Sequence, residues 1–117
     1  MDYTTTFIGH IDISPPLMPE TVELINAFCR ERHDGPGYLT VWCDLVVADD
    51  GASIGWNGSE KPYEIPRWLE IIIARFIDGS VHRLNGTMHA HGEEAGDVWK
   101  LVCKDSVVSV VKLLKDW

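Results

Sequence analysis

The apolar positions in the first third of the chain change from a strand-like to a helix-like spacing. Residues 3–13, YTTTFIGHIDI, are rich in β-branched side chains, and Phe7, Ile11 and Ile13 point to one side of an extended chain. After the turn SPPLMP, apolar residues recur three or four positions apart in PETVELINAFCRERH, and its leading proline suits the first turn of a helix. We therefore expect a strand over 3–13 and a helix over 19–33.

A hairpin and a second helix follow in the middle of the chain. Residues 38–51 alternate, with one set facing one side (Leu39, Val41, Cys43, Leu45) and the other set facing away (Tyr38, Thr40, Trp42, Asp44). The turn residues Asp49 and Asp50 lead into a short returning strand at 52–56, so the two strands should pair as a hairpin. Residues 66–78 predict a helix, whose core stripe we assign to Leu69, Ile72, Ile73 and Phe76, widened by Trp68, Ile71 and Ile77.

Three further strands are predicted in the last third, at 81–92, 97–105 and 106–114. The order strand-helix-strand-strand-helix-strand-strand-strand indicates an α+β fold with a mostly antiparallel sheet and both helices on one face. The first four strands follow the ferredoxin-like order, in which the first and fourth strands are neighbours, and the last strands form a C-terminal meander. We expect residues 1–117 to form a single α+β domain, with Ile72 and Phe76 packed on the inner sheet face against Ile11 and Val41.

Charge and composition narrow the possible partners. The chain is 45% hydrophobic, carries a formal net charge of −8 and has only ten Lys and Arg scattered along it, which disfavours nucleic-acid binding. The N-terminal segment lacks the pattern of a signal peptide, and the longest apolar segment is short and contains Glu70 and Arg75, which disfavours a membrane span. We expect a protein of the bacterial cytoplasm with no cofactor.

The three cysteines, Cys29, Cys43 and Cys103, lie far apart and form no C-x-x-C motif. This pattern is typical of reduced, buried thiols in a cytosolic protein rather than of a structural zinc site. Cys29 and His33 are four residues apart on the predicted helix, but Cys29 lies on its apolar stripe, which favours packing over a nucleophilic pair. We expect all three thiols to be free.

A loop and a hairpin in the C-terminal two-thirds resemble a known group of sequences. The loop WNGSEKPY, residues 56–63, precedes a tryptophan-bearing helix, and a later hairpin contains Leu84, Gly86, Gly92 and Glu93. The chain is similar here to small uncharacterised proteins of actinobacteria and their bacteriophages, which share a W-[DN]-G-x-E-K-x-Y loop and a C-terminal β-meander. It departs from that pattern at His89 and His91. The resemblance implies a phage or actinobacterial origin and no known activity.

The segment HAHGEE, residues 89–94, is the strongest candidate for metal or catalytic chemistry. His89 and His91 should share the outward face of one strand, and His10 should lie on the outward face of the neighbouring strand. Three imidazoles could hold Zn²⁺ or Ni²⁺, but if Thr4 to Thr6 pair opposite His89 to His91, His10 lies several residues away. We therefore expect solvated histidines, no bound metal and no catalytic residue, with Glu93 and Glu94 in a turn.

The predicted outer face of the sheet also carries aromatic side chains. Tyr38, Trp42 and Asp44 share the outward side of their strand, and Trp99 alternates with Val98 and Lys100. A face with Tyr and Trp beside polar groups is typical of a protein interface. The alternative is that the C-terminal meander curls over this face and buries it.

These patterns favour a non-enzymatic binding protein, encoded by a phage, that occludes a host or phage protein surface. The residues proposed for partner binding are the open-face group and the acidic turns (Tyr38, Trp42, Asp44, Trp99, Asp49, Asp50, Glu93, Glu94). The partner would be a protein, with a basic surface complementary to the acidic loops, or a second copy of the chain. The alternatives are a metal-binding protein or hydrolase using His10, His89 and His91, and an acidic inhibitor that mimics DNA.

Overall fold

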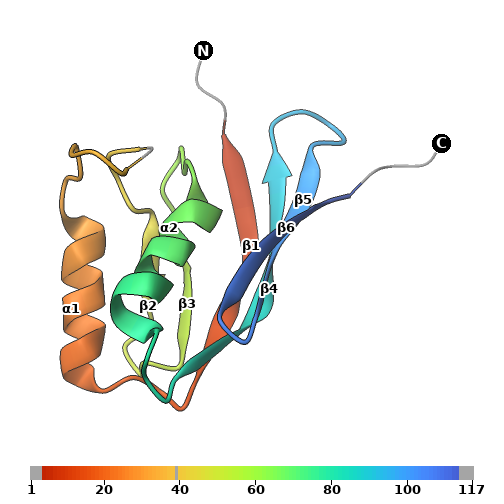
Figure 1. The fold of residues 1–117 in the computed structure, drawn as a ribbon. Helices are drawn as coiled ribbons and strands as arrows, with labels where there is room; N and C mark the ends of the chain where they lie inside the picture. The colour runs from red at the N-terminus through yellow and green to blue at the C-terminus, as the bar shows by residue number, and fades with distance from the viewer. Residues whose placement is uncertain (1–3, 39, 114–117) are drawn as a thin grey trace.

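The computed structural model describes residues 4–38 and 40–113 and contains one six-stranded sheet and two helices (Figure 1). Along the chain the elements are β1 (Thr5–Ser14), α1 (Pro19–Arg30), β2 (Leu45–Val47), β3 (Ser53–Trp56), α2 (Ile65–Ile72), the π-helical turn η1 (Ile73–Ile77), β4 (Arg83–Gly92), β5 (Val98–Lys104) and β6 (Val107–Lys112). The predicted α+β class and element order are confirmed. Tyr3, Leu39 and Leu114, which the predicted strands include, lie outside the described residues.

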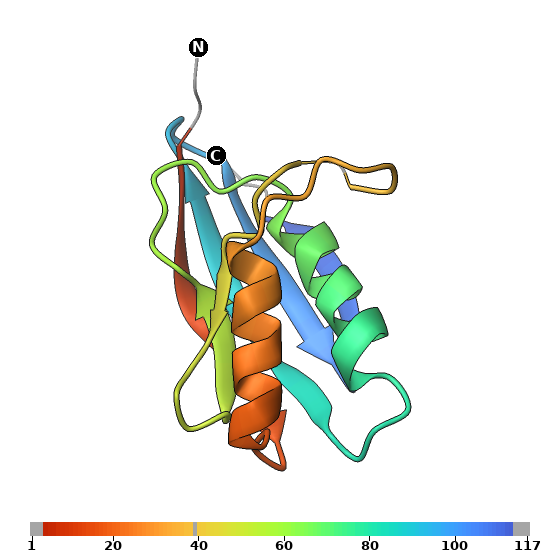
Figure 2. The same cartoon turned by 90° about the vertical axis from the view of Figure 1, so that its left-hand side faces the viewer.

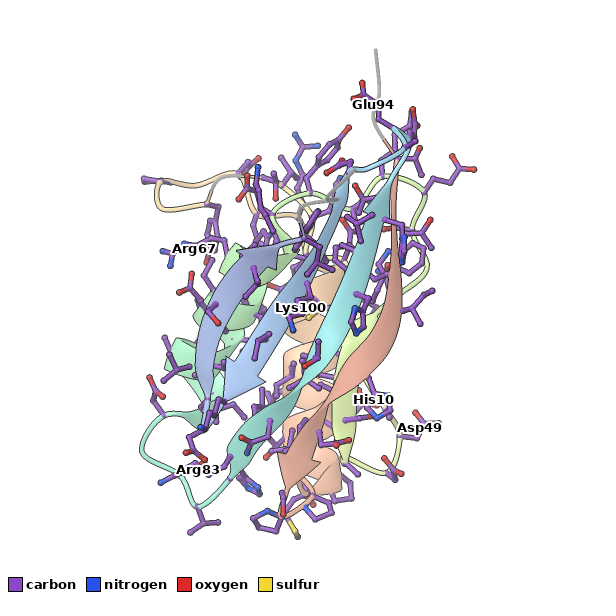
Figure 3. The ribbon with its side chains drawn as sticks, turned by 90° about the vertical axis from the view of Figure 1, so that its right-hand side faces the viewer. His10, Asp49, Arg67, Arg83, Glu94 and Lys100 are labelled. Atoms are coloured by element: carbon purple, nitrogen blue, oxygen red, sulfur yellow. The ribbon has the colours of Figure 1, made fainter. Side chains whose placement is uncertain are left out.

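The sheet has the strand order β2-β3-β1-β4-β5-β6, and neighbouring strands are antiparallel. The first four strands therefore have the predicted ferredoxin-like order, with β1 between β3 and β4. Strands β5 and β6 extend the sheet beyond β4 as a meander. They continue the sheet rather than fold across it, so the alternative in which the meander buries the outer face is wrong (Figure 3).

Both helices pack on the same side of the sheet (Figure 2). Helix α1 lies over the β2 side, with Val22, Ile25, Phe28 and Cys29 buried at helical spacing, and α2 lies near β6. Between them and the sheet is the apolar core, to which the strands contribute every second residue (Phe7, Ile11, Ile13, Leu84, Met88, Ala90, Leu101, Cys103). This arrangement leaves the opposite side of the sheet to solvent.

The strand predicted from Tyr38 begins only at Leu45, because the described residues before it, Tyr38 and 40–44, pair with no strand. Strand β2 begins at Leu45, which pairs with Trp56 at the end of β3. One further bond follows that pair, from the Asn57 amide to the Asp44 carbonyl at 3.1 Å. The segment after β3 then turns away from residues 40–43 at Gly58, which has a φ of +88°. Cys43 is buried and Tyr38 packs against the core, but neither residue extends the sheet.

The stripe of the second helix is also shifted from the prediction. The amide of Asp78 donates to the carbonyl of Ile73 at 2.8 Å, which is the i to i+5 bond of a π turn. The wider turn changes the phase of the stripe, so Ile77 is buried and Phe76 is only partly buried. The expectation that Phe76 lies deep in the core with Ile72 was wrong, and Ile77 takes the buried position.

Candidate functional site: the open face of the sheet

The side of the sheet away from the helices is uncovered in the part of the chain that the structure describes (Figure 3). Because cross-strand partners share a face, the register and the alternation along each strand identify its side chains. We call the following set the open face: Thr6, Ile8, His10 and Asp12 of β1; Arg83, Asn85, Thr87, His89 and His91 of β4; Val98, Lys100, Val102 and Lys104 of β5; Val107, Ser109 and Val111 of β6.

One row of side chains crosses four strands in the middle of this face. Ile8 pairs with His89, His89 pairs with Lys100, and Lys100 pairs with Val111. Ile8 is 61% exposed, a high value for an isoleucine on one of the two central strands of the sheet. The row therefore places apolar side chains at its two ends and a histidine and a lysine between them.

The three histidines lie on the open face, as predicted, but in different rows. His10 pairs with Thr87, His89 pairs with Ile8, and His91 pairs with Thr6, so the register differs by two residues from the one considered from the sequence. His10 is instead hydrogen-bonded through Nε2 to Asp12 Oδ1 at 3.1 Å, and both side chains are exposed. Within residues 4–38 and 40–113, no cluster of three or more His, Cys, Asp or Glu could hold a metal ion.

Charge is distributed unevenly between the open face and the rest of the molecule. The chain has a net charge of −8, yet the open face contains Arg83, Lys100 and Lys104 against a single carboxylate, Asp12, among the residues that define it. In Figure 3, Lys100 lies near the middle of the sheet, while Glu94 lies beyond one end of it and Asp49 beyond one side. The face therefore carries Lys100 near its centre and Arg83 and Lys104 at strand ends, with acidic turns outside it.

The acidic residues proposed for partner binding lie in exposed turns, as the sequence indicated. Asp49 and Asp50 are in the β2–β3 turn, where the Asp50 carboxylate accepts a hydrogen bond from the Ala52 amide at 3.0 Å. Glu93 and Glu94 are in the β4–β5 turn, and Glu93 Oε1 accepts from the Thr4 amide at 2.8 Å. These carboxylates flank the open face rather than form part of it.

The aromatic residues assigned to the open face lie elsewhere, which corrects that part of the prediction. Trp99 points to the helix side, where its ring makes an edge contact with Phe7 at 5.5 Å. Tyr38 stacks on Trp68 with ring centres 5.3 Å apart, and its hydroxyl accepts a hydrogen bond from Arg75 at 3.3 Å. Both residues pack against the core. They are therefore not part of the open face, and their assignment to a binding surface on that face is wrong.

Trp42 and Asp44 border a separate cleft of about 500 Å³ between α1 and β2. Trp42 is 51% exposed, but it lies in the loop before β2 and not on the sheet. Burial raises the pKa of Asp44, and this effect outweighs the hydrogen bonds from Ser59, the Tyr63 backbone and Asn57. The sequence placed these two side chains on the same surface as the histidines, whereas the fold places them on the helix side of β2.

Sequence reasoning missed the row of Ile8, Lys100 and Val111, although it placed Ile8 correctly on the outward side of its strand. It did not place Lys100 there, because Trp99, which alternates with Lys100, was assigned to the open face. The available signal was alternation itself, because an isoleucine in phase with Thr6 and His10 cannot point into the core. The pairing that joins them into one row depends on the register of three strand pairs, which alternation does not give.

Comparison of the chain with protein-family models, with curated protein sequences and with solved structures finds no match. The described helices are all too short or too polar to cross a membrane. The open face is therefore interpreted from its own chemistry.

Proposed function

We propose that this chain is a non-enzymatic binding protein that covers a protein surface with its open sheet face. The observation that carries the proposal is the row Ile8, His89, Lys100 and Val111, in which a largely exposed isoleucine stands next to polar groups on an uncovered sheet. The acidic turns would contact the edges of the same partner. We further propose that the protein is phage-encoded and acts in the bacterial cytoplasm, in line with the resemblance in its C-terminal two-thirds.

The composition of the open face supports a contact rather than simple solvation. An antiparallel sheet with one solvated face normally presents polar residues on it. Here that face carries Ile8 and the valines of β5 and β6 at outward positions (Val98, Val102, Val107, Val111). Interfaces of non-obligate complexes have this mixture of apolar and polar area, and histidine and lysine supply hydrogen bonds that fix the orientation of the partner.

The edge of the sheet next to this face favours the same function. Strand β6, with the sequence VVSVVK, is the outermost strand, and it lacks the charged residues that usually protect an edge until Lys112. An added strand from a partner, or from a second copy of the chain, would bond to its free side and continue the open face. This edge contact would add to the cover of the open face, whether the partner is a second copy of the chain or another protein.

Replacing Ile8 with lysine is expected to weaken association, either with a second copy or with a protein captured from a bacterial lysate, by about tenfold or more. This follows from the cost of burying an unpaired charge where an apolar side chain was covered, and central interface positions typically lose about 2 kcal/mol when altered. Sedimentation velocity over a range of concentrations measures self-association, and quantitative pull-down measures capture.

The matched control is Leu24→Lys, because Leu24 is also 61% exposed but lies on the outer side of α1. This variant should associate like the wild-type chain, and both variants should melt close to it, since neither side chain is buried. Equal loss of association in the two variants would indicate a general effect of charge. Unchanged association in Ile8→Lys would mean that the open face is not the binding surface.

A further inference from the structure

Two of the three cysteines meet in the folded chain. Cys29, in the last turn of α1, and Cys43, in the segment before β2, are both buried, and their sulfur atoms lie 3.3 Å apart. Cys103 is on β5, where its Sγ lies 3.5 Å from the Leu84 carbonyl oxygen. All three are free thiols in the structure, as expected from the sequence, but the pairing of Cys29 with Cys43 is not visible in their spacing.

The scaffold on both sides of this pair holds the sulfurs in place. Asn26, one turn before Cys29, donates through Nδ2 to the Val47 carbonyl at 3.0 Å and accepts from the Val47 amide at 2.8 Å. These two hydrogen bonds tie α1 to β2. The His33 amide donates to the Val41 carbonyl at 2.9 Å, which fixes the chain just before Cys43. The approach of the two sulfurs therefore follows from backbone positions that are fixed by hydrogen bonds.

The pair has unequal proton affinity. The pKa of Cys43 is lowered, mainly by the hydrogen bond between its sulfur and the sulfur of Cys29, with a further contribution from the Leu45 backbone. The pKa of Cys29 is raised by the same hydrogen bond and by the burial of its side chain. For Cys103, burial raises the pKa to about 11. Since the thiolate is the nucleophile, the lowered pKa favours Cys43 as the attacking member of the pair.

Both sulfur-bearing residues line the cleft of about 500 Å³ between α1 and β2. Arg30, Trp42, Asp44 and Asn57 also line it. The cleft therefore brings solvent up to the two residues, which are otherwise buried. Formation of a disulfide requires the sulfurs to approach from 3.3 Å to about 2.05 Å, a change of roughly 1.3 Å.

We propose that Cys29 and Cys43 form a reversible redox pair that is oxidised to a disulfide by a hydroperoxide. The Cys43 thiolate attacks one peroxide oxygen, the O–O bond breaks, and the leaving oxygen takes a proton and departs as water or an alcohol. The Cys43 sulfenic acid that results is then attacked by Cys29 sulfur, which forms the S–S bond and breaks the S–O bond. The released hydroxide takes the Cys29 proton as water, so two electrons pass from the two sulfurs to the peroxide.

Treatment of the native protein with hydrogen peroxide should convert Cys29 and Cys43 to a disulfide while Cys103 stays reduced. The readout is alkylation after unfolding, followed by peptide mapping, which should show the Cys29–Cys43 cross-linked peptide and alkylated Cys103. A dithiol reductant should restore all three thiols. The pair should react at least about tenfold faster than Cys103, as its thiolate character and cleft position imply.

Variants assign the two roles. Cys103→Ser should form the disulfide at the wild-type rate, and Cys29→Ser should accumulate a Cys43 sulfenic acid that dimedone captures. Cys43→Ser should leave Cys29 about as unreactive as Cys103. The proposal is wrong if all three thiols of the wild-type chain stay alkylatable after peroxide treatment, or if they oxidise at equal rates. This measurement uses the wild-type protein alone, so it does not depend on whether a variant folds. Capture of a sulfenic acid on Cys29 would overturn the assignment of Cys43 as the attacking residue.

Discussion

Replacing Trp68 with alanine is expected to lower the free energy of unfolding by about 3–5 kcal/mol, the usual cost of truncating a buried large aromatic side chain. Trp68 is 1% exposed and packs against the rings of Phe28, Tyr38 and His33. Its indole Nε1–H donates to Thr40 Oγ1 at 2.7 Å. The substitution therefore removes the centre of an aromatic cluster that joins α1 and α2 to His33 and Tyr38. Chemical denaturation of the purified variant measures the loss.

Trp42→Ala is the control for this prediction, because Trp42 is 51% exposed and lies in the loop before β2. Its effect on the free energy of unfolding should stay within about 1 kcal/mol, as for other surface substitutions. A Trp42 variant that is destabilised as much as the Trp68 variant would mean that the segment before β2 is packed differently from the structure described above.

Gly51→Ala is expected to destabilise the fold by about 2–5 kcal/mol. Gly51 closes the β2–β3 turn with a φ of +72°, and a left-handed backbone costs a residue with a side chain about 1–2 kcal/mol. A Cβ at this position would also lie 2.4 Å from the Leu17 carbonyl oxygen and 2.9 Å from the Leu17 nitrogen. The approach is fixed, since the Leu17 amide donates to the Gly51 carbonyl at 2.9 Å. The backbone must move, which adds a cost of about 1–3 kcal/mol.

Gly79→Ala separates the two contributions. Gly79 has a similar φ of +83°, but a Cβ there would have no atom within 4 Å among the described residues. This variant should show only the conformational cost of about 1–2 kcal/mol. If the two alanine variants unfold at the same denaturant concentration, the contact between the turn and Leu17 does not constrain Gly51.

The spacing of apolar residues predicted most of the fold, because in each correct element the residues that follow a strand or helix spacing are also the residues that pack into the core. Phe7, Ile11 and Ile13 alternate in the sequence, and they also face the helices across the full pairing of β1 with β4. The helix of residues 19–30 has its apolar stripe and its leading proline where the sequence indicated. It ends at Arg30, three residues before the predicted end, because Glu31 has an extended backbone.

The errors arose where a strand pattern had no partner. The sequence of residues 38–44 alternates as in a strand, but β3 ends at Trp56, which pairs with Leu45. The length of β3 cannot be read from the sequence of residues 38–44. The π turn is a similar case, since Phe76 lies next to the i to i+5 bond at Ile73 and is only partly buried, although its spacing placed it on the core stripe. Both features depend on hydrogen bonds between segments or turns, to which hydrophobic periodicity is insensitive.

The candidate sites were predicted only in part for the same reason. Alternation placed His10, His89 and His91 on one face, but the register that separates them into different rows comes from the pairing of β1 with β4. Trp42 does not lie on that face, because the strand that was predicted to contain it begins only at Leu45. Cys29 and Cys43 are fourteen residues apart in sequence, and they meet only because Asn26 holds α1 against β2.

The central claim is that the open face is the surface that a partner covers, and acylation of lysines in the free and associated protein tests it most directly. Lys100 lies near the middle of the open face (Figure 3), and Lys104 lies on the same strand, whereas Lys61 is in the loop between β3 and α2. We expect Lys100 and Lys104 to be acylated several-fold more slowly in the complex or dimer, with Lys61 unchanged. Protection of Lys61 with Lys100 labelled as in the free chain would contradict the account, as would a chain that forms no complex at all.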